Sequence, residues 1–96
     1  MVTVIATVEV KDGKMEETIN VLKEMVQKVK SIEPGTLEYF PHTVKGRKFK
    51  NTIVIYEKYE NEDALRTHMG NLAKLTEKFV KLLKPGLDFK TCYEIV

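Results

Sequence analysis

Two short segments of the chain hold the residues best able to do chemistry. The first, Glu33–Tyr39, reads EPGTLEY, and the second runs from Tyr56 to His68. In the second segment, Glu57 lies in an expected strand and His68 lies one turn into the helix that follows. An unperturbed imidazole titrates near neutral pH, and a neighbouring carboxylate can orient it and stabilise its protonated form. His68 and Glu57 are therefore our candidate catalytic residues, with the imidazole as a proton acceptor or as an orienting donor for a bound hydroxyl.

Both residues also have a purely structural interpretation. His68 falls on the apolar stripe of Leu65, Leu72 and Leu75, where a single hydrogen bond could satisfy a packed imidazole. Glu57 could equally be a surface carboxylate, since the alternation of a strand does not by itself say which face it takes. The sequence leaves these alternatives open.

The other candidate pocket residues are two tyrosines and four apolar side chains. Tyr39 and Tyr56 could offer hydroxyl groups to a ligand, or their rings could pack with the hydroxyls at the rim. Apolar walls would keep water away from reactive intermediates. The candidates for these substrate-binding walls are Ile5, Leu65, Leu72 and Phe79.

Signatures of metal and cofactor sites are absent from the sequence. The two histidines, His42 and His68, have no Asp or Cys nearby at ligand spacing. The five glycines are isolated and form neither a phosphate loop nor a dinucleotide fingerprint. We therefore expect no metal and no cofactor, and we expect His42 on the surface or at a dimer seam.

Composition narrows the class of protein and its partners. The chain has 96 residues, of which 43% are hydrophobic and 31% charged, as is typical of one globular domain spanning residues 1–96. The net charge of +2 and the mixing of acids with bases argue against nucleic acid as a partner. The densest basic cluster, residues 45–50, is expected to form a solvated hairpin tip, with an anionic-ligand contact as the alternative. The single Cys92 favours a reducing cytoplasm, and no apolar run could span a bilayer.

Apolar periodicity predicts the elements that position these residues. Alternating β-branched residues predict a strand over 1–10, and apolar spacings of three or four predict a helix over 15–32. A second helix is expected to start at the N-cap Asn61, to bend or break near Gly70, and to end at Pro85-Gly86. Further strands are expected at 36–44, 51–59 and 87–96. The order predicts an α+β, ferredoxin-like β-α-β-β-α-β fold, a four-stranded antiparallel sheet with both helices on one face.

The sheet face away from the helices needs a cover of its own. The first strand is apolar on both sides, and in the third strand Ile53 and Ile55 alternate with Val54 and Tyr56. Apolar surface of this extent is typical of an interface. We expect the same face of a second copy to cover it, in an isologous homodimer.

Over nearly its whole length the chain resembles the antibiotic biosynthesis monooxygenase family of the dimeric α+β barrel superfamily. The resemblance rests on Val4-Ile5-Ala6, the turn 11–14, residues 33–39, Glu57-Lys58-Tyr59, and Ala64-Leu65 followed by His68. It implies a homodimer whose sheets pack face to face, with a pocket between each sheet and its own helices. The best-characterised members oxidise aromatic phenols or quinols with molecular oxygen, without metal or flavin.

The resemblance also implies which branch of the family to exclude. Its haem-degrading members use a tryptophan and a first-strand asparagine, whereas this chain has no tryptophan and carries Ala6 and Thr7 there. The resulting hypothesis is a cofactor-independent monooxygenase that acts on a quinol or phenolic aromatic small molecule with molecular oxygen. The alternatives are a non-catalytic dimeric module for small-ligand binding or stress response, and an isomerase of a small metabolite.

Overall fold

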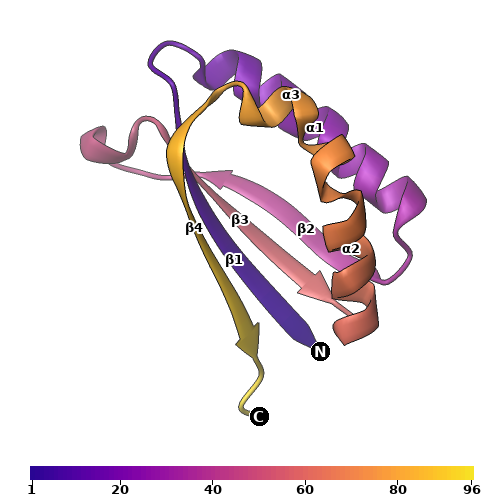
Figure 1. Ribbon diagram of the computed structural model, residues 1–96. Helices are drawn as coiled ribbons and strands as arrows, with labels where there is room; N and C mark the ends of the chain where they lie inside the picture. The colour runs from indigo at the N-terminus through magenta and orange to yellow at the C-terminus, as the bar shows by residue number, and fades with distance from the viewer.

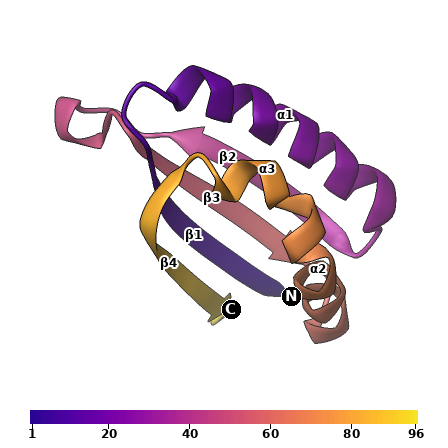
Figure 2. The same cartoon turned by 45° about the horizontal axis from the view of Figure 1, so that its top comes forward.

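Four antiparallel strands and a layer of helices make up the protein, in a computed structural model that describes residues 1–96 (Figure 1). Across the sheet the strands are ordered β2-β3-β1-β4. The elements along the chain are β1 (Val2–Val10), α1 (Met15–Ile32), β2 (Thr36–Thr43), the short 3-10 helix η1 (Arg47–Phe49), β3 (Thr52–Tyr59), α2 (Glu62–Leu75), α3 (Glu77–Val80) and β4 (Leu83–Tyr93). Figure 2 shows the helices on one face of the sheet. The predicted ferredoxin-like order is confirmed.

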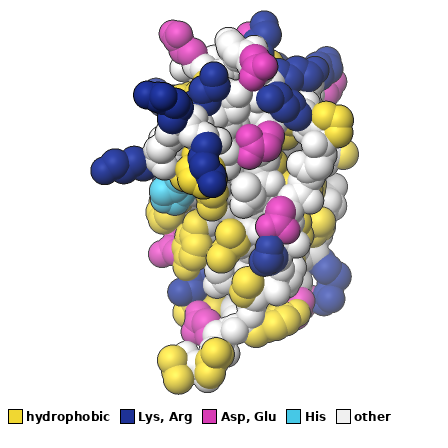
Figure 3. Space-filling view, turned by 90° about the vertical axis from the view of Figure 1, so that its left-hand side faces the viewer, with side chains coloured by type: hydrophobic (Ala, Val, Ile, Leu, Met, Phe, Trp, Pro, Cys, Tyr) yellow, Lys and Arg dark blue, Asp and Glu magenta, His cyan; other side chains and the backbone are white.

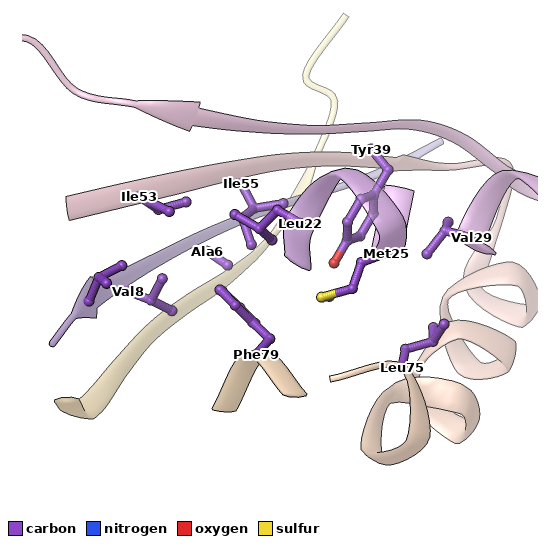
Figure 4. Packing of buried hydrophobic residues seen from close by; sticks show 11 residues of the cluster. Ala6, Val8, Leu22, Met25, Val29, Tyr39, Ile53, Ile55, Leu75 and Phe79 are labelled. Atoms are coloured by element: carbon purple, nitrogen blue, oxygen red, sulfur yellow. The ribbon is translucent and has the colours of Figure 1, made fainter. Parts of the chain in front are cut away.

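Strand alternation decides which side chains enter the core. The even-numbered residues of β1, from Val2 to Val10, are all buried on the helical side. The paired strand β3 adds Ile53 and Ile55, and α1 packs its apolar stripe against them. Figure 4 shows Phe79 reaching from α3 toward the sheet, beneath the side chains of the α1 stripe. The core therefore lies between the sheet and the helices.

The second half of the helical layer differs from the expectation in two places. α2 runs through Gly70 without a break and ends at Leu75, and the interruption before α3 comes at Thr76. There the Thr76 hydroxyl donates to the Leu72 carbonyl at 2.7 Å, which competes with continuation of the helix. Gly70 is tolerated because a helix interior accepts glycine at a modest cost.

Pro85-Gly86 does not end the helix, contrary to the expectation, but forms a bulge inside β4. Val8 of β1 pairs with Leu87, whereas Val10 pairs with Leu83, so three residues of β4 face one residue of β1. Gly86 adopts a φ of +104°, which glycine accepts and other residues avoid. Proline has no N–H for the ladder, and the bulge removes the need for one. β4 consequently begins at Leu83, four residues earlier than predicted.

The opposite face of the sheet carries an apolar row across three strands. Ile5 of β1 pairs with Tyr56 of β3, which pairs with Phe40 of β2. Ile5 is 38% exposed and Phe40 46% exposed. Figure 3, which views the molecule from the side away from the helices, shows hydrophobic side chains below a group of Lys and Arg side chains. None of the helices has the length and apolar character needed to cross a membrane.

Candidate functional site

His68 is held inside the protein by α2 and by two aromatic rings. α2 begins at Asn61, whose side chain accepts a hydrogen bond from the Ala64 N–H at 2.9 Å and so caps the helix. His68 is only 1% exposed. Its ring centroid lies 5.4 Å from that of Tyr39 and 5.3 Å from that of Tyr59, both in tilted arrangements. This packing restricts rotation of the imidazole.

Glu33 orients the imidazole of His68 through a hydrogen bond with its Nδ1 atom. It follows α1, where its backbone N–H donates to the Val29 carbonyl at 2.9 Å, and its carboxylate is 3% exposed. His68 Nδ1 lies 2.8 Å from Glu33 Oε1. The same carboxylate accepts hydrogen bonds from the Thr36 hydroxyl at 2.8 Å and from the Asn71 amide at 3.0 Å. A carboxylate accepts and does not donate, so Nδ1 is the donor in this contact, and in the neutral form of the imidazole Nε2 is then the basic nitrogen.

Gly35 allows this contact between the end of α1 and α2. A Cβ atom built on Gly35 would lie 2.7 Å from the Cβ of Ala64, closer than real Cβ contacts. The missing side chain lets the start of β2 approach the first turn of α2, and Glu33 comes within reach of His68. The Pro34-Gly35 pair therefore ends α1 and also sets the distance between two elements.

Glu57 approaches the imidazole from the sheet. It pairs with Val4 of β1 and Tyr39 of β2, so its side chain points toward the helices, where it is 3% exposed. Its Oε1 atom lies 3.7 Å from His68 Nε2 and accepts a hydrogen bond from the Tyr59 hydroxyl at 2.5 Å. The pKa of Glu57 is raised, chiefly because burial disfavours the charged form, although the Tyr59 hydrogen bond and His68 act in the other direction. A buried carboxyl with a raised pKa is typical of a functional site.

The two tyrosines around the imidazole keep their protons. Burial is the main cause that raises the pKa of Tyr39 and of Tyr59, and the neighbouring Glu57 raises both further. Tyr59 therefore acts as a hydrogen-bond donor to Glu57 rather than as an acid. Tyr39 presents a neutral phenol.

A cavity of about 430 Å³ opens beside His68 and Glu57. His68 and Glu57 both line this cavity, and the nearest charged group to His68 Nε2 is Glu57 Oε1 at 3.7 Å, beyond hydrogen-bond distance. The walls are mostly apolar: Ala6, Val8, Ile55, Leu72, Phe79, Val80, Leu83, Pro85, Leu87 and Phe89. The volume lies within the range of small-molecule sites, about 300–1,000 Å³. No three His, Cys, Asp or Glu side chains are arranged to hold a metal ion.

The structure brings five of the eight candidate residues to this cavity. Glu57, His68, Tyr39, Leu72 and Phe79 all line it. Ile5 and Tyr56, which were expected among the substrate-binding residues, lie on the opposite sheet face and do not line this cavity. The reason is the two-residue alternation of β1, whose even-numbered residues form the core. Leu65 is also outside the cavity and packs against Val2, Val4 and Tyr59.

Glu33 is the functional residue that sequence reasoning missed, although it begins one of the two segments chosen for chemistry. The signal was its spacing: Met25, Val29 and Glu33 are four residues apart, and the first two are buried. A carboxylate that continues the apolar stripe of a helix is directed toward the interior. Such a position requires a partner, which here is His68.

Comparison with known protein families shows which family the chain belongs to. The sequence profile of the antibiotic biosynthesis monooxygenase family matches residues 1–83. The chain belongs to this family. No curated protein sequence matches it.

Solved structures share the monooxygenase-family fold at low sequence identity. A Caulobacter crescentus CB15 protein named for the same family superposes with a TM-score of 0.85 at 23% identity, over 99% of this chain and 90% of that one. A conserved Methanosarcina mazei Go1 protein gives 0.81 at 17% identity, over 97% and 91% of the two chains. A Mycobacterium tuberculosis protein gives 0.80 at 18% identity, over 99% and 95%. These likenesses confirm the fold.

Proposed function

We propose that this protein is a monooxygenase that oxidises a phenol or quinol with molecular oxygen, without metal or flavin, and that His68 is its general base. The observation that carries the proposal is the state of one buried imidazole. Its Nδ1 atom lies 2.8 Å from Glu33, its Nε2 atom lies 3.7 Å from Glu57, and His68 and Glu57 both line a mostly apolar cavity. A base held in one tautomer at the wall of an apolar pocket suits removal of a proton from a bound hydroxyl.

The reaction begins with transfer of the phenolic proton to His68 Nε2. The resulting phenolate is electron-rich and passes an electron to oxygen directly, after which the oxygen species combines with the ring. For a phenol with a free para position, one oxygen atom enters the ring and the other leaves as water, while the substrate becomes a quinone. The substrate loses four electrons and oxygen gains four, so no external reductant is consumed.

Two carboxylates assist the protonated imidazole. Glu33 contacts Nδ1 and Glu57 lies 3.7 Å from Nε2, so the imidazolium formed in the first step is flanked by acceptors on both sides. A nearby negative charge favours the protonated form of histidine. General-base catalysis of this type contributes roughly 10²–10⁴-fold in rate.

The apolar walls protect the later steps. Leu72 of α2, Phe79 of α3 and Phe89 of β4 line the cavity on three sides. Exclusion of water strengthens the electrostatic interactions inside and prevents side reactions of an oxygenated intermediate. We propose that these residues pack against the substrate and that Tyr39 contacts the substrate's hydroxyl group.

The test is oxygen uptake with a panel of naphthoquinols and hydroxyanthrones, followed together with the absorbance of the quinone product. The proposal expects uptake above the buffer rate, with one oxygenated quinone and one water formed per oxygen consumed and no hydrogen peroxide released. No uptake above buffer with any compound would contradict it. Saturable binding of the same compounds without uptake would instead support a non-catalytic binding module.

The proposal includes a homodimer formed through the uncovered sheet face. The row Ile5, Tyr56 and Phe40 exposes apolar surface across three strands, which a second copy could cover by two-fold symmetry. Sedimentation velocity should give the mass of two chains. Replacing Phe40 by Lys should place like charges across the interface and shift the protein to a single chain. A single chain for the unchanged protein would contradict the dimer.

A further inference from the structure

Basic residues are concentrated in the segments at one end of the protein, beside the acids Glu9, Glu16 and Glu17 of the adjoining strand and helix. The three loops at the end where β1 finishes and β4 starts, residues 11–14, 45–51 and 81–86, contain eight of the sixteen Lys and Arg side chains and a single acid, Asp12. Hydrogen bonds join these loops: the Lys11 ammonium donates to the Lys81 carbonyl at 2.9 Å, and the Asn51 amide donates to Asp12 at 2.7 Å. Figure 3 shows the Lys and Arg side chains gathered at this end. The rest of the chain carries eight basic and thirteen acidic residues.

The cavity reaches this basic end through the bulge in β4. Lys84, Pro85 and Gly86 form the bulge, and all three line the cavity. Lys84 is the only cationic Lys or Arg side chain among the lining residues. Its ammonium lies 3.4 Å from Asp12 Oδ1, in a pair whose side chains are 44% and 81% exposed. Exposed pairs of this kind contribute little, so Lys84 can turn to a ligand at small cost.

The base and the cation lie at opposite ends of the cavity. Glu57 pairs with Val4 of β1, whereas the bulge lies between the pairs made by Val8 and Val10. Four to six residues of strand separate these levels, or about 13–20 Å of backbone. The flexible four-carbon side chain of Lys84 covers part of this distance, so a bound molecule has to span less than the backbone separation. Between the two ends the walls are apolar, including Ile55, Leu72 and Phe79.

We infer that the substrate of the proposed reaction is an anionic phenol, with its hydroxyl at His68 and a carboxylate or another acidic group at Lys84. This inference rests on the proposed function and adds the chemical class of the substrate. The aromatic body fills the apolar stretch between the two polar ends. The surrounding lysines raise the local concentration of anions and steer them toward the mouth of the cavity. Lys84 is the residue that determines specificity, because it alone of these cations lines the cavity.

The experiment measures binding without turnover, in the absence of oxygen. The test compounds are 6-hydroxy-2-naphthoic acid and its methyl ester, which share the hydroxyl and the ring system and differ in one negative charge. Fluorescence titration at low and at physiological salt gives both affinities. The acid should bind about fivefold more tightly than the ester, as expected for a partly exposed ionic contact. Equal affinities, or no binding of either compound, would overturn the inference.

Two lysine variants separate a direct contact from long-range attraction. Lys84→Met removes the ammonium of a residue that lines the cavity and keeps an apolar stem, whereas Lys81→Met removes an exposed charge at the same end from a residue that does not line the cavity. Both variants lower the net charge equally. Only Lys84→Met should abolish the preference for the acid, measured as the ratio of the two affinities within each variant. Equal losses in the two variants would overturn the assignment of Lys84, and circular dichroism checks that both are folded.

The same design distinguishes failure of this inference from failure of the proposed function. A preference for the acid that depends on Lys84 supports the substrate class even if no compound supports oxygen uptake. Oxygen uptake with neutral quinols that is indifferent to Lys84 would support the proposed function and overturn the anionic class.

Discussion

Two hollows of similar size border the two histidines of this protein, and they differ in what surrounds the imidazole. The cavity beside α2 has about 430 Å³ and contains His68, whereas a groove between α1 and β2 has about 370 Å³ and is bordered by His42. His68 is buried between two carboxylates and two tyrosine rings. His42 is exposed on β2 and takes part in no ion pair or side-chain hydrogen bond.

The difference shows that a histidine beside a hollow does not make a site. The groove at His42 is lined by α1 residues such as Leu22 and Val26 and by the edge strand β2, and it contains no buried acid. His68 contacts one carboxylate from the end of α1, Glu33, and another from β3, Glu57, and the second of these also lines the cavity. A hydrogen bond from Nδ1 to a buried carboxylate sets the orientation of an imidazole and, in its neutral form, its tautomer. The variants that follow test whether activity depends on the buried imidazole of His68 and on the carboxylates around it.

The largest expected effect is the loss of activity when the buried imidazole is replaced. His68→Asn keeps an N–H donor near Glu33 but removes the basic nitrogen, so turnover should fall about 10²–10⁴-fold. The matched variant His42→Ala should retain the full rate. Oxygen uptake and thermal unfolding of both variants provide the measurement. An unchanged rate in His68→Asn would remove this residue from the mechanism.

The second effect concerns the carboxylate that orients the imidazole. Glu33→Ala leaves one buried donor, His68, and two partly buried donors, Thr36 and Asn71, without their acceptor. The loss should lower the free energy of unfolding by about 2–4 kcal/mol. Glu33→Gln keeps the shape and one acceptor oxygen, and it should fold while losing about tenfold in rate, mainly in kcat. Urea unfolding and steady-state kinetics measure the two variants. If Glu33→Ala were as stable as the unchanged protein, the buried network would not support this region.

The third effect tests the close approach that brings Glu33 to α2. Gly35→Ala introduces a Cβ atom 2.7 Å from that of Ala64, and the forced shift should cost about 1–3 kcal/mol of stability. Gly70→Ala in α2, the helix that contains Ala64, meets no atom within 4 Å and should instead stabilise the protein by about 0.5–1 kcal/mol. Thermal unfolding of the pair provides the measurement. Equal stabilities would show that the corner at Gly35 tolerates a side chain and does not set the distance to α2.

The smallest expected effect is a change in the pH dependence of stability through Glu57. Burial raises its pKa above the ordinary value of 4.5, so the folded chain binds this proton more tightly than the unfolded chain does. The resulting stabilisation is fully present below pH 4.5 and is lost as the pH rises through the raised pKa. Glu57→Gln should lack this loss and show a flatter curve above pH 4.5.

The control for this prediction is Glu16→Gln, which changes an exposed carboxyl on α1. Its unfolding free energy should follow the same pH curve as the unchanged protein. Urea unfolding at intervals between pH 4 and 8 compares the three proteins. A curve for Glu57→Gln that is parallel to the other two would contradict the raised pKa of Glu57.

The periodicity of apolar residues and the residues that cap helices or form turns were enough to predict most of the fold from the sequence. The apolar spacing of α1, the alternation of β1 and the Asn61 cap predicted their elements, because each signal depends on residues close together in the chain. The signal failed at Pro85-Gly86, which sequence reasoning took as the end of a helix. Whether such a pair ends a helix or forms a bulge depends on the partner strand, and here β1 supplies the partner for β4.

The sequence by itself determined the order of the elements, the family resemblance and the choice of His68 and Glu57. The tertiary structure decided that Glu57 faces the helices while Ile5 and Tyr56 face away, and that Glu33 holds Nδ1 of the imidazole. It also placed Lys84 at the far end of the same cavity. The physical reason is that a site is assembled from residues tens of positions apart, whose distances are set by strand register and by the close approach at Gly35. Neither of these is encoded in a local pattern.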